Sequence, residues 1–169
     1  MSTEVGWADP EMMISEPRVQ RVAGFHYLYV QQKHVAESDV GWAMGDLMPK
    51  ALEAYRQGQE GVEPPSMLAM FIDLPGEPNV YDVQVGYASR EGVPARGGAQ
   101  VRYVEPALCA SLLVWGTLDD ILKSYGPLMG FVEAKGLTNV EGWREWYLYW
   151  EDAASRNNVT LVQHVVAET

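Results

Sequence analysis

The feature that most constrains this chain is a pair of helix-breaking residues repeated at one spacing. Two predicted helices each carry a proline near the middle, Pro49 and Pro127, and the two prolines lie 78 residues apart. A proline inside a helix removes a hydrogen bond and costs roughly 3 kcal/mol, so two of them at matching places are informative. Gly58 and Gly136, at the ends of the same helices, have the same spacing. We therefore predict an internal duplication.

Hydrophobic periodicity and turn residues place the elements of the two halves. Helices are predicted within residues 39–58, with Ser38 or Asp39 as N-cap, and 116–136, with Thr117 and Asp120 as a capping box. Strands are predicted over residues 18–31, 67–74, 80–88, 99–105, 107–115, 143–150 and 159–167.

This order of elements predicts an α+β fold. We expect duplicated βαββ halves, about 17–90 and 99–167, that form one curved antiparallel sheet with two main helices and a central ligand cleft. Residues 1–15 are expected to be an N-terminal extension, and residues 16–169 a single ligand-binding domain.

Composition narrows the class of function. The chain has 169 residues, 47% of them hydrophobic, and a formal net charge of −11. An acidic surface without a basic run argues against direct nucleic-acid binding. The single cysteine, Cys109, and the start MSTEVGWADPEMM, which is unlike a signal peptide, predict a cytoplasmic location. The longest apolar run, ALCASLLVWG, is about half of what a bilayer needs, so no membrane contact is expected.

One predicted strand combines aromatic rings with a carboxylate. Residues 142–150 read GWREWYLYW. Because side chains alternate along a strand, one face would carry Trp143, Glu145, Tyr147 and Tyr149. A buried carboxylate needs a partner, and aromatic faces attract cations. The pattern indicates a pocket for an aromatic, cationic ligand.

A second interpretation of the same strand stays open. Aromatic strands are common in protein cores, and Glu145 would be an ordinary surface acid if Trp146 and Trp150, on the opposite face, pointed inward. The sequence pattern does not decide between the two orientations.

Other site chemistry finds little support in the sequence. His26, His34 and His164 are isolated, so we predict no metal site and expect each to be a surface or a hydrogen-bonded core histidine. The glycines at residues 97–98 lack the strand-to-helix context of a phosphate-binding loop, and no cofactor is expected.

The order of elements resembles the GyrI-like small-molecule-binding domains, which also form the effector-binding part of bacterial multidrug-sensing transcription activators. The resemblance covers residues 16–167. It is carried by the segments EPRVQRVAGF, EPPSMLAMFIDLP, YDVQVGYA, ALCASLLVWGTLDDILKSYGPL, REWY and VTLVQHVV. It implies two βαββ halves with a groove between them.

The resemblance also implies roles for individual residues. In the family's Arg-Glu-x-Tyr strand the glutamate faces bound cations, and Arg144, Glu145 and Tyr147 match this pattern. Groove-lining side chains of the first helix and the second strand correspond loosely to Met44 or Trp42 and to Met67 and Phe71. Ligand preference is not carried over, because Phe71-Ile72 and Tyr87-Ala88 replace the Tyr-His and Pro-Val pairs that the family often has.

The predicted function is therefore a stand-alone binding protein for aromatic, cationic or amphiphilic drug-like compounds. About 15 residues precede the first predicted strand, too few for a DNA-binding helix-turn-helix. A role in transcription regulation would be played as a stand-alone ligand binder or through a partner, and the partner would be a second copy of the chain or a regulatory protein. Two alternatives remain. One is a hydrolase of strained, cyclopropane-type toxic compounds that uses Glu145, Tyr147 and Tyr125; the other is a protein modulator of a DNA topoisomerase.

Overall fold

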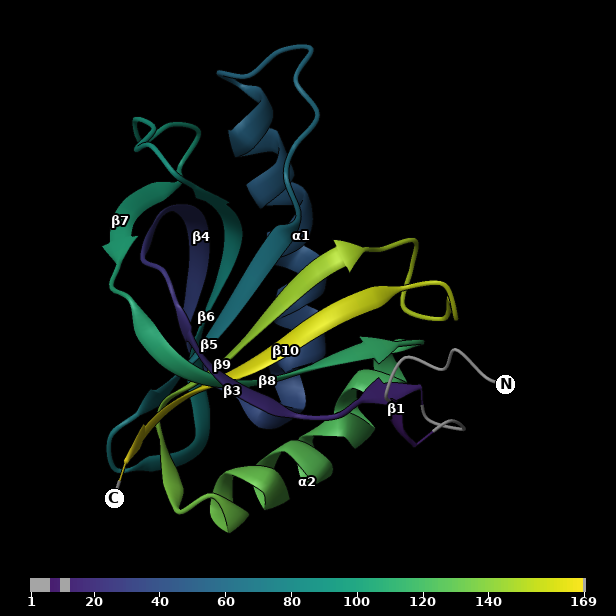
Figure 1. The fold of residues 1–169 in the computed structure, drawn as a ribbon. Coiled ribbons are helices and arrows are strands. Elements are labelled where there is room, and N and C mark those ends of the chain that lie inside the picture. The colour runs from purple at the N-terminus through teal and green to yellow at the C-terminus, as the bar shows by residue number, and fades with distance from the viewer. Residues whose placement is uncertain (1–6, 10–12, 169) are drawn as a thin grey trace. The chain divides into compact units, whose positions relative to one another are not determined.

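The computed structural model describes residues 7–9 and 13–168, and the chain divides into two compact units. Unit 1 consists of Met1–Val22 and Ala107–Thr169, and unit 2 of Ala23–Pro106. Each unit contains antiparallel strands and one long helix (Figure 1). The fold class is therefore α+β, as predicted.

Unit 2 contains four antiparallel strands with one helix packed on them. Its strands are β4 (Phe25–Ala36), β5 (Met67–Leu74), β6 (Glu77–Ser89) and β7 (Gln100–Val104), in the spatial order β5-β6-β4-β7. A short 3-10 helix, η1 (Glu37–Asp39), leads into α1 (Val40–Arg56). Helix α1 packs on β4 and β6. Its buried side chains are Ala43, Leu47, Ala51 and Ala54.

Unit 1 has the same plan with two short additions. Its strands are β1 (Trp7–Asp9), β2 (Ile14–Ser15), β3 (Arg18–Val22), β8 (Ala107–Trp115), β9 (Leu137–Tyr149) and β10 (Val159–Glu168). Strand β8 pairs with β10, β3 and β2, and β10 pairs with β9. Helix α2 (Leu118–Ala134) packs on β8, β9 and β10 (Figure 1).

The internal duplication is visible in both helices and in the strand order of both units. Helices α1 and α2 each have 17 residues, and their first and last residues are 78 positions apart, like Pro49 and Pro127. The order β3-β8-β10-β9 in unit 1 matches β7-β4-β6-β5 in unit 2. In each unit, the first strand of this series comes from the other half of the sequence.

Because β3 and β7 each pair with strands from the other half of the sequence, one predicted strand is wrong. Residues 18–31, predicted as one strand, are broken into β3 and β4 at Ala23-Gly24. A Cβ at Gly24 would lie 2.8 Å from the carbonyl oxygen of Val104, so the chain passes too close to β7 for a larger residue. The break lets β3 pair with β8 while β4 pairs with β7.

The ends of the two helices are stabilised by different hydrogen bonds. The predicted capping box of α2 is confirmed: Thr117 Oγ1 accepts from the amide of Asp120, whose carboxylate accepts from the amide of Thr117. Asp39 is the N-cap of α1, but its side chain makes no capping hydrogen bond. At the other end of α1, Arg96 donates to the carbonyl oxygens of Ala54 and Tyr55, at 3.0 and 2.9 Å. These bonds satisfy carbonyls that a helix end leaves unpaired.

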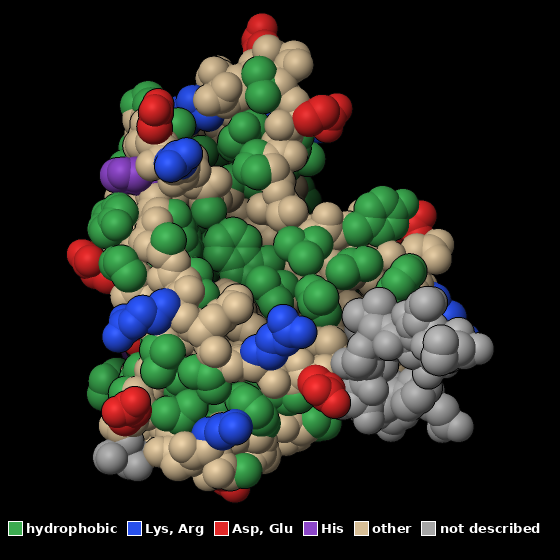
Figure 2. All heavy atoms as spheres, viewed as in Figure 1, with side chains coloured by type: hydrophobic (Ala, Val, Ile, Leu, Met, Phe, Trp, Pro, Cys, Tyr) green, Lys and Arg blue, Asp and Glu red, His purple; other side chains and the backbone are tan. Residues whose placement is uncertain are grey.

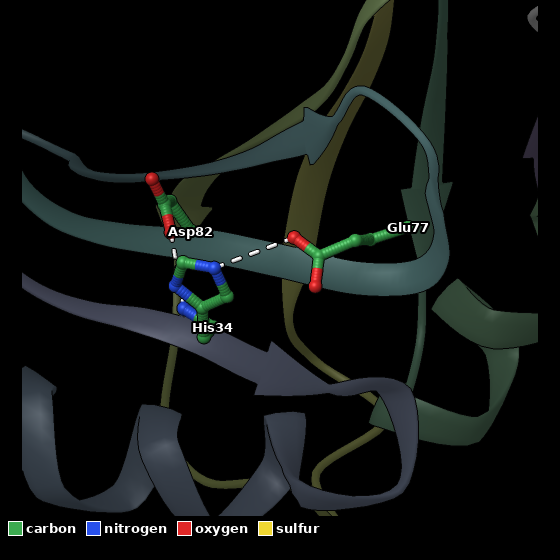
Figure 3. Close-up of polar contacts among 3 residues, drawn as sticks. All are labelled: His34, Glu77 and Asp82. Carbon is green, nitrogen blue, oxygen red and sulfur yellow. Dashed lines mark hydrogen bonds and ion pairs between the residues drawn. The ribbon is translucent and has the colours of Figure 1, made fainter.

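A β-bulge in β4 is stabilised by the contacts of His34 (Figure 3). The register between β4 and β6 shifts between Gln32 and Val35, and His34 has a φ of 54°. The His34 amide donates to the Asp82 carboxylate at 3.0 Å, and its ring Nε2 lies 3.3 Å from a carboxylate oxygen of Glu77. The bulge is therefore held by two acids on β6.

Two surface observations bear on partners. On the face drawn in Figure 2, Lys and Arg side chains lie separately among hydrophobic and acidic ones. Within residues 7–9 and 13–168, neither long helix has the length and hydrophobicity of a membrane-spanning segment.

Candidate functional site

The carboxylate of Glu145 is buried in unit 1 and surrounded by aromatic hydrogen-bond donors. Only 5% of the Glu145 surface is exposed. Its Oε1 accepts a hydrogen bond from the hydroxyl of Tyr147 at 2.6 Å. Its Oε2 accepts from Trp143 Nε1 at 3.2 Å and from the hydroxyl of Tyr125. The outward-facing interpretation of Glu145 is therefore wrong.

Two elements bring these four side chains together. Strand alternation places Trp143, Glu145 and Tyr147 on the face of β9 that α2 covers, with Arg144 on the opposite face. Helix α2 buries Ile121, Ser124, Leu128 and Val132 against the sheet. Tyr125 lies half-buried beside this stripe, and its hydroxyl reaches Glu145.

The two carboxylate oxygens differ in their surroundings. Tyr147, which binds Oε1, is only 6% exposed, whereas Tyr125 and Trp143, which bind Oε2, are both half-buried. The rings of Tyr125 and Trp143 also contact each other edge to face, with centroids 5.5 Å apart. Oε2 is therefore the oxygen nearer to the partly exposed side of the cluster.

Burial controls the charge of the site. Loss of hydration raises the pKa of Glu145 from its ordinary value of 4.5 to about 7, although the hydrogen bond from Tyr147 works in the opposite direction. Near neutral pH the carboxyl is therefore divided between its two protonation states. Such a group can bind a cation in its ionised form or exchange a proton with a bound molecule.

His164 on β10 belongs to the same cluster. It lies opposite Trp143 in the strand register, and its ring centroid is 6.2 Å from that of Trp143 and 6.1 Å from that of Tyr125. It is 4% exposed, and neither ring nitrogen has a hydrogen-bond partner among the described residues. Burial lowers the pKa of His164 to about 4, so the imidazole is neutral at neutral pH.

The expectation of a hydrogen-bonded or surface histidine was therefore wrong for His164. Its place in the cluster depends on the β9–β10 register, which periodicity along one strand does not reveal. The signal present in the sequence was weaker: a histidine inside the apolar strand VTLVQHVVA.

Strand alternation fails at the end of β9. The register with β10 shifts between Tyr147 and Tyr149, which leaves Leu148 as an extra residue. Tyr149 is consequently 52% exposed and lies outside the cluster. Trp150, predicted on the opposite face, instead contacts the ring of Tyr147, with centroids 5.0 Å apart. The bulge therefore exchanges the expected positions of Tyr149 and Trp150.

The other four predicted ligand-binding residues belong to unit 2. Trp42 and Met44 lie in the first turns of α1, where Trp42 is 71% exposed and Met44 is half-buried. Met67 begins β5 and is half-buried, whereas Phe71, in the middle of β5, is buried. Their role in ligand binding stays a prediction.

Unit 2 also contains a hollow of about 290 Å³. It lies at the edge formed by β4 and β7, under the loop that follows β6, and it is lined by His26, Tyr27, Gly92, Val93, Val101, Arg102 and Tyr103. The predicted ligand-binding residues do not line it. No group of three or more potential metal-binding side chains occurs in the described part of the chain.

The fold is shared with several solved structures, although the sequence matches no family model and no curated protein. The EcmrR chain, solved in complex with DNA in EcmrR-RPo, is 16% identical to this chain, with a TM-score of 0.71. The match covers 94% of this chain but only 59% of the EcmrR chain. The EcmrR C-terminal domain is 15% identical, with a TM-score of 0.71, and the match covers 91% of this chain and 98% of that domain.

Two further structures extend the comparison. SAV2435 bound to tetraphenylphosphonium is 10% identical with a TM-score of 0.67, covering 90% of this chain and 94% of that one. A hydrolase from Listeria innocua is 13% identical with a TM-score of 0.60, covering 90% and 92%. At these identities the likeness shows a common fold.

Proposed function

We propose that this protein binds lipophilic aromatic cations, and that Glu145 in unit 1 supplies the negative charge that recognises them. The observation that carries the proposal is the buried carboxylate whose hydrogen-bond donors all belong to aromatic side chains. A buried charge is expensive unless it is paired. A cationic guest would supply the missing opposite charge.

The geometry suggests how a guest is held. Tyr147 keeps Oε1 in place from the buried side, so the carboxylate stays oriented. Tyr125 and Trp143, which are half-buried, would release their hydrogen bonds to Oε2 when a cation binds there, or would contact the cation with their ring faces. A cation over an aromatic face gains about 0.5–2 kcal/mol, depending on desolvation.

The structural neighbours support the ligand class. SAV2435, which shares the fold, has been solved with tetraphenylphosphonium, an aromatic cation. The EcmrR C-terminal domain matches nearly the whole of this chain. Together with the Arg-Glu-x-Tyr pattern at residues 144–147, this favours a GyrI-like ligand-binding domain related to the effector-binding domains of transcription regulators.

Binding should depend on pH in a defined direction. Only the ionised carboxylate attracts a cation, and burial raises the pKa of Glu145 to about 7 in the free protein. Affinity for a permanently charged cation should therefore fall by up to tenfold for each pH unit below about 7, and reach a plateau above it.

Titration with tetraphenylphosphonium, followed by tryptophan fluorescence and calorimetry, tests the proposal. At about pH 8, Glu145→Gln should weaken binding by at least about 30-fold, equivalent to ~2 kcal/mol, and abolish the pH dependence. Glu141→Gln is the matched control, because Glu141 is an exposed acid of the same strand. Equal effects of the two substitutions, or no binding at all, would refute the assignment.

A second function is favoured by the protonation state of the same residue. A carboxyl with a pKa of about 7, hydrogen-bonded to Tyr125 and Tyr147, is suited to general acid–base chemistry. The fold is also that of a Listeria innocua hydrolase. Turnover of a cyclopropane-bearing electrophile, lost in Glu145→Gln and retained in Glu141→Gln, would establish this alternative.

A further inference from the structure

His164 is a buried polar side chain whose hydrogen-bonding capacity is unused. Both of its ring nitrogens lack a partner among the described residues, and the residue is 4% exposed. Buried polar groups are nearly always hydrogen-bonded, and leaving one unpaired costs free energy. Here the exception belongs to the same side-chain cluster as the Glu145 carboxylate, so the imidazole is a candidate hydrogen-bonding group for a ligand bound there.

The histidine and the carboxylate share the same two aromatic neighbours. Tyr125 and Trp143 each donate to Glu145 Oε2, and the ring of each also contacts the His164 ring. Across the strand pair, Glu145 faces Val162, which places His164 on the diagonal of Glu145 on the same face of the sheet. A ligand at Oε2 therefore lies beside the imidazole.

The state of the imidazole defines what it can bind. Burial holds the pKa of His164 at about 4, so near neutral pH one ring nitrogen carries a lone pair and the other an N–H group. A neutral imidazole does not repel a cation, and its lone pair accepts a hydrogen bond. The cluster thus contains two acceptors, the carboxylate and the imidazole, in a setting of aromatic rings.

We propose that His164 is the second polar contact for the ligand, and that the preferred ligands are aromatic cations with N–H donors, such as aryl amidinium ions. This inference rests on the proposed function, because it assumes that cations bind at Glu145. A planar amidinium presents two N–H-bearing nitrogens, one for the carboxylate and one for the imidazole. A quaternary ammonium ion of the same ring size offers the charge without a donor.

Two single-ring probes separate the contributions of charge and hydrogen bonding. Benzamidinium and phenyltrimethylammonium carry the same charge, and only benzamidinium has N–H donors. Titrations at about pH 8 should show that the unaltered protein prefers benzamidinium by at least about tenfold, because its N–H groups donate to both the carboxylate and the imidazole and one net hydrogen bond is worth up to about tenfold. In His164→Leu this preference should fall by about tenfold, the value of the hydrogen bond to the imidazole, while the hydrogen bond to the carboxylate remains. His164→Gln, which keeps an acceptor, should restore part of the loss.

The controls distinguish this inference from the function on which it rests. His26→Leu, in unit 2, should keep the preference for benzamidinium. Glu145→Gln should weaken the binding of both probes and of tetraphenylphosphonium. Equal affinity of the unaltered protein for the two probes, or a preference that keeps its full size in His164→Leu, overturns the role of His164. If tetraphenylphosphonium still responds to Glu145→Gln in that case, the proposed function stands. Failure of all three cations to bind overturns both.

Discussion

Replacing Glu145 by glutamine tests the physical premise of the site without any ligand. In the folded protein, burial raises the pKa of Glu145 from 4.5 to about 7, so between these values the folded state binds more protons than the unfolded state. Stability from this group is then complete below about pH 4.5 and is lost as the pH rises through 7. The full difference amounts to about 3 kcal/mol, since each pKa unit is worth about 1.4 kcal/mol.

Urea unfolding at about pH 5 and about pH 8.5 measures this contribution. From about pH 5 to about pH 8.5, the free energy of unfolding of the wild-type protein should fall by about 2 to 3 kcal/mol relative to that of Glu145→Gln. His164 and the other titrating groups are present in both proteins, so their contributions cancel in the difference. Any effect of the amide that does not depend on pH cancels as well.

Glu141→Gln provides the control, because it removes an exposed acid from the same strand. Its difference from wild type should change by less than about 0.5 kcal/mol over this range. If the difference between wild type and Glu145→Gln were equally constant with pH, the carboxyl would not be desolvated, and Glu145 would not be the buried charge that a cation is proposed to pair with.

Four further substitutions test other features of the structure. His164→Leu should make the free energy of unfolding less dependent on pH. Because burial lowers the pKa of His164 from 6.5 to about 4, the free energy of unfolding of wild type, measured with urea, should fall by about 2 kcal/mol relative to that of the variant as the pH is lowered from about 7.5 to about 5. Thr117→Ala breaks the capping box of α2 and should cost about 1 kcal/mol, seen as a lower Tm; an unchanged Tm would contradict the cap. Gly86→Ala should destabilise unit 2 by about 2 kcal/mol or more, because a Cβ at this position would lie 2.7 Å from the Tyr29 Cα. In Gly130→Ala the new Cβ, on α2, meets nothing within 4 Å, so this variant should be more stable by up to about 1 kcal/mol. If denaturant titrations gave a similarly small effect for both variants, the close approach at Gly86 would be refuted.

Features encoded within a few residues were predictable from the sequence. Strands β5 and β8 begin and end where apolar runs and turn residues place them, and the capping box of α2 is as predicted. The matching of Pro49 and Pro127 predicted two similar helices, because a helix-breaking residue has a local cost that is visible without tertiary contacts. The placement of Trp143, Glu145 and Tyr147 on one face followed from the two-residue period of a strand.

What the sequence by itself determined is therefore the α+β class, the repeated order of elements, and a carboxylate set among rings on one strand. The tertiary structure decided the partners. The exchange of β3 and β7, the bulge that turns Tyr149 away, and the register that brings His164 to Trp143 depend on strands far apart in the chain. Periodicity specifies which way a side chain points, whereas pairing between distant strands specifies what it meets.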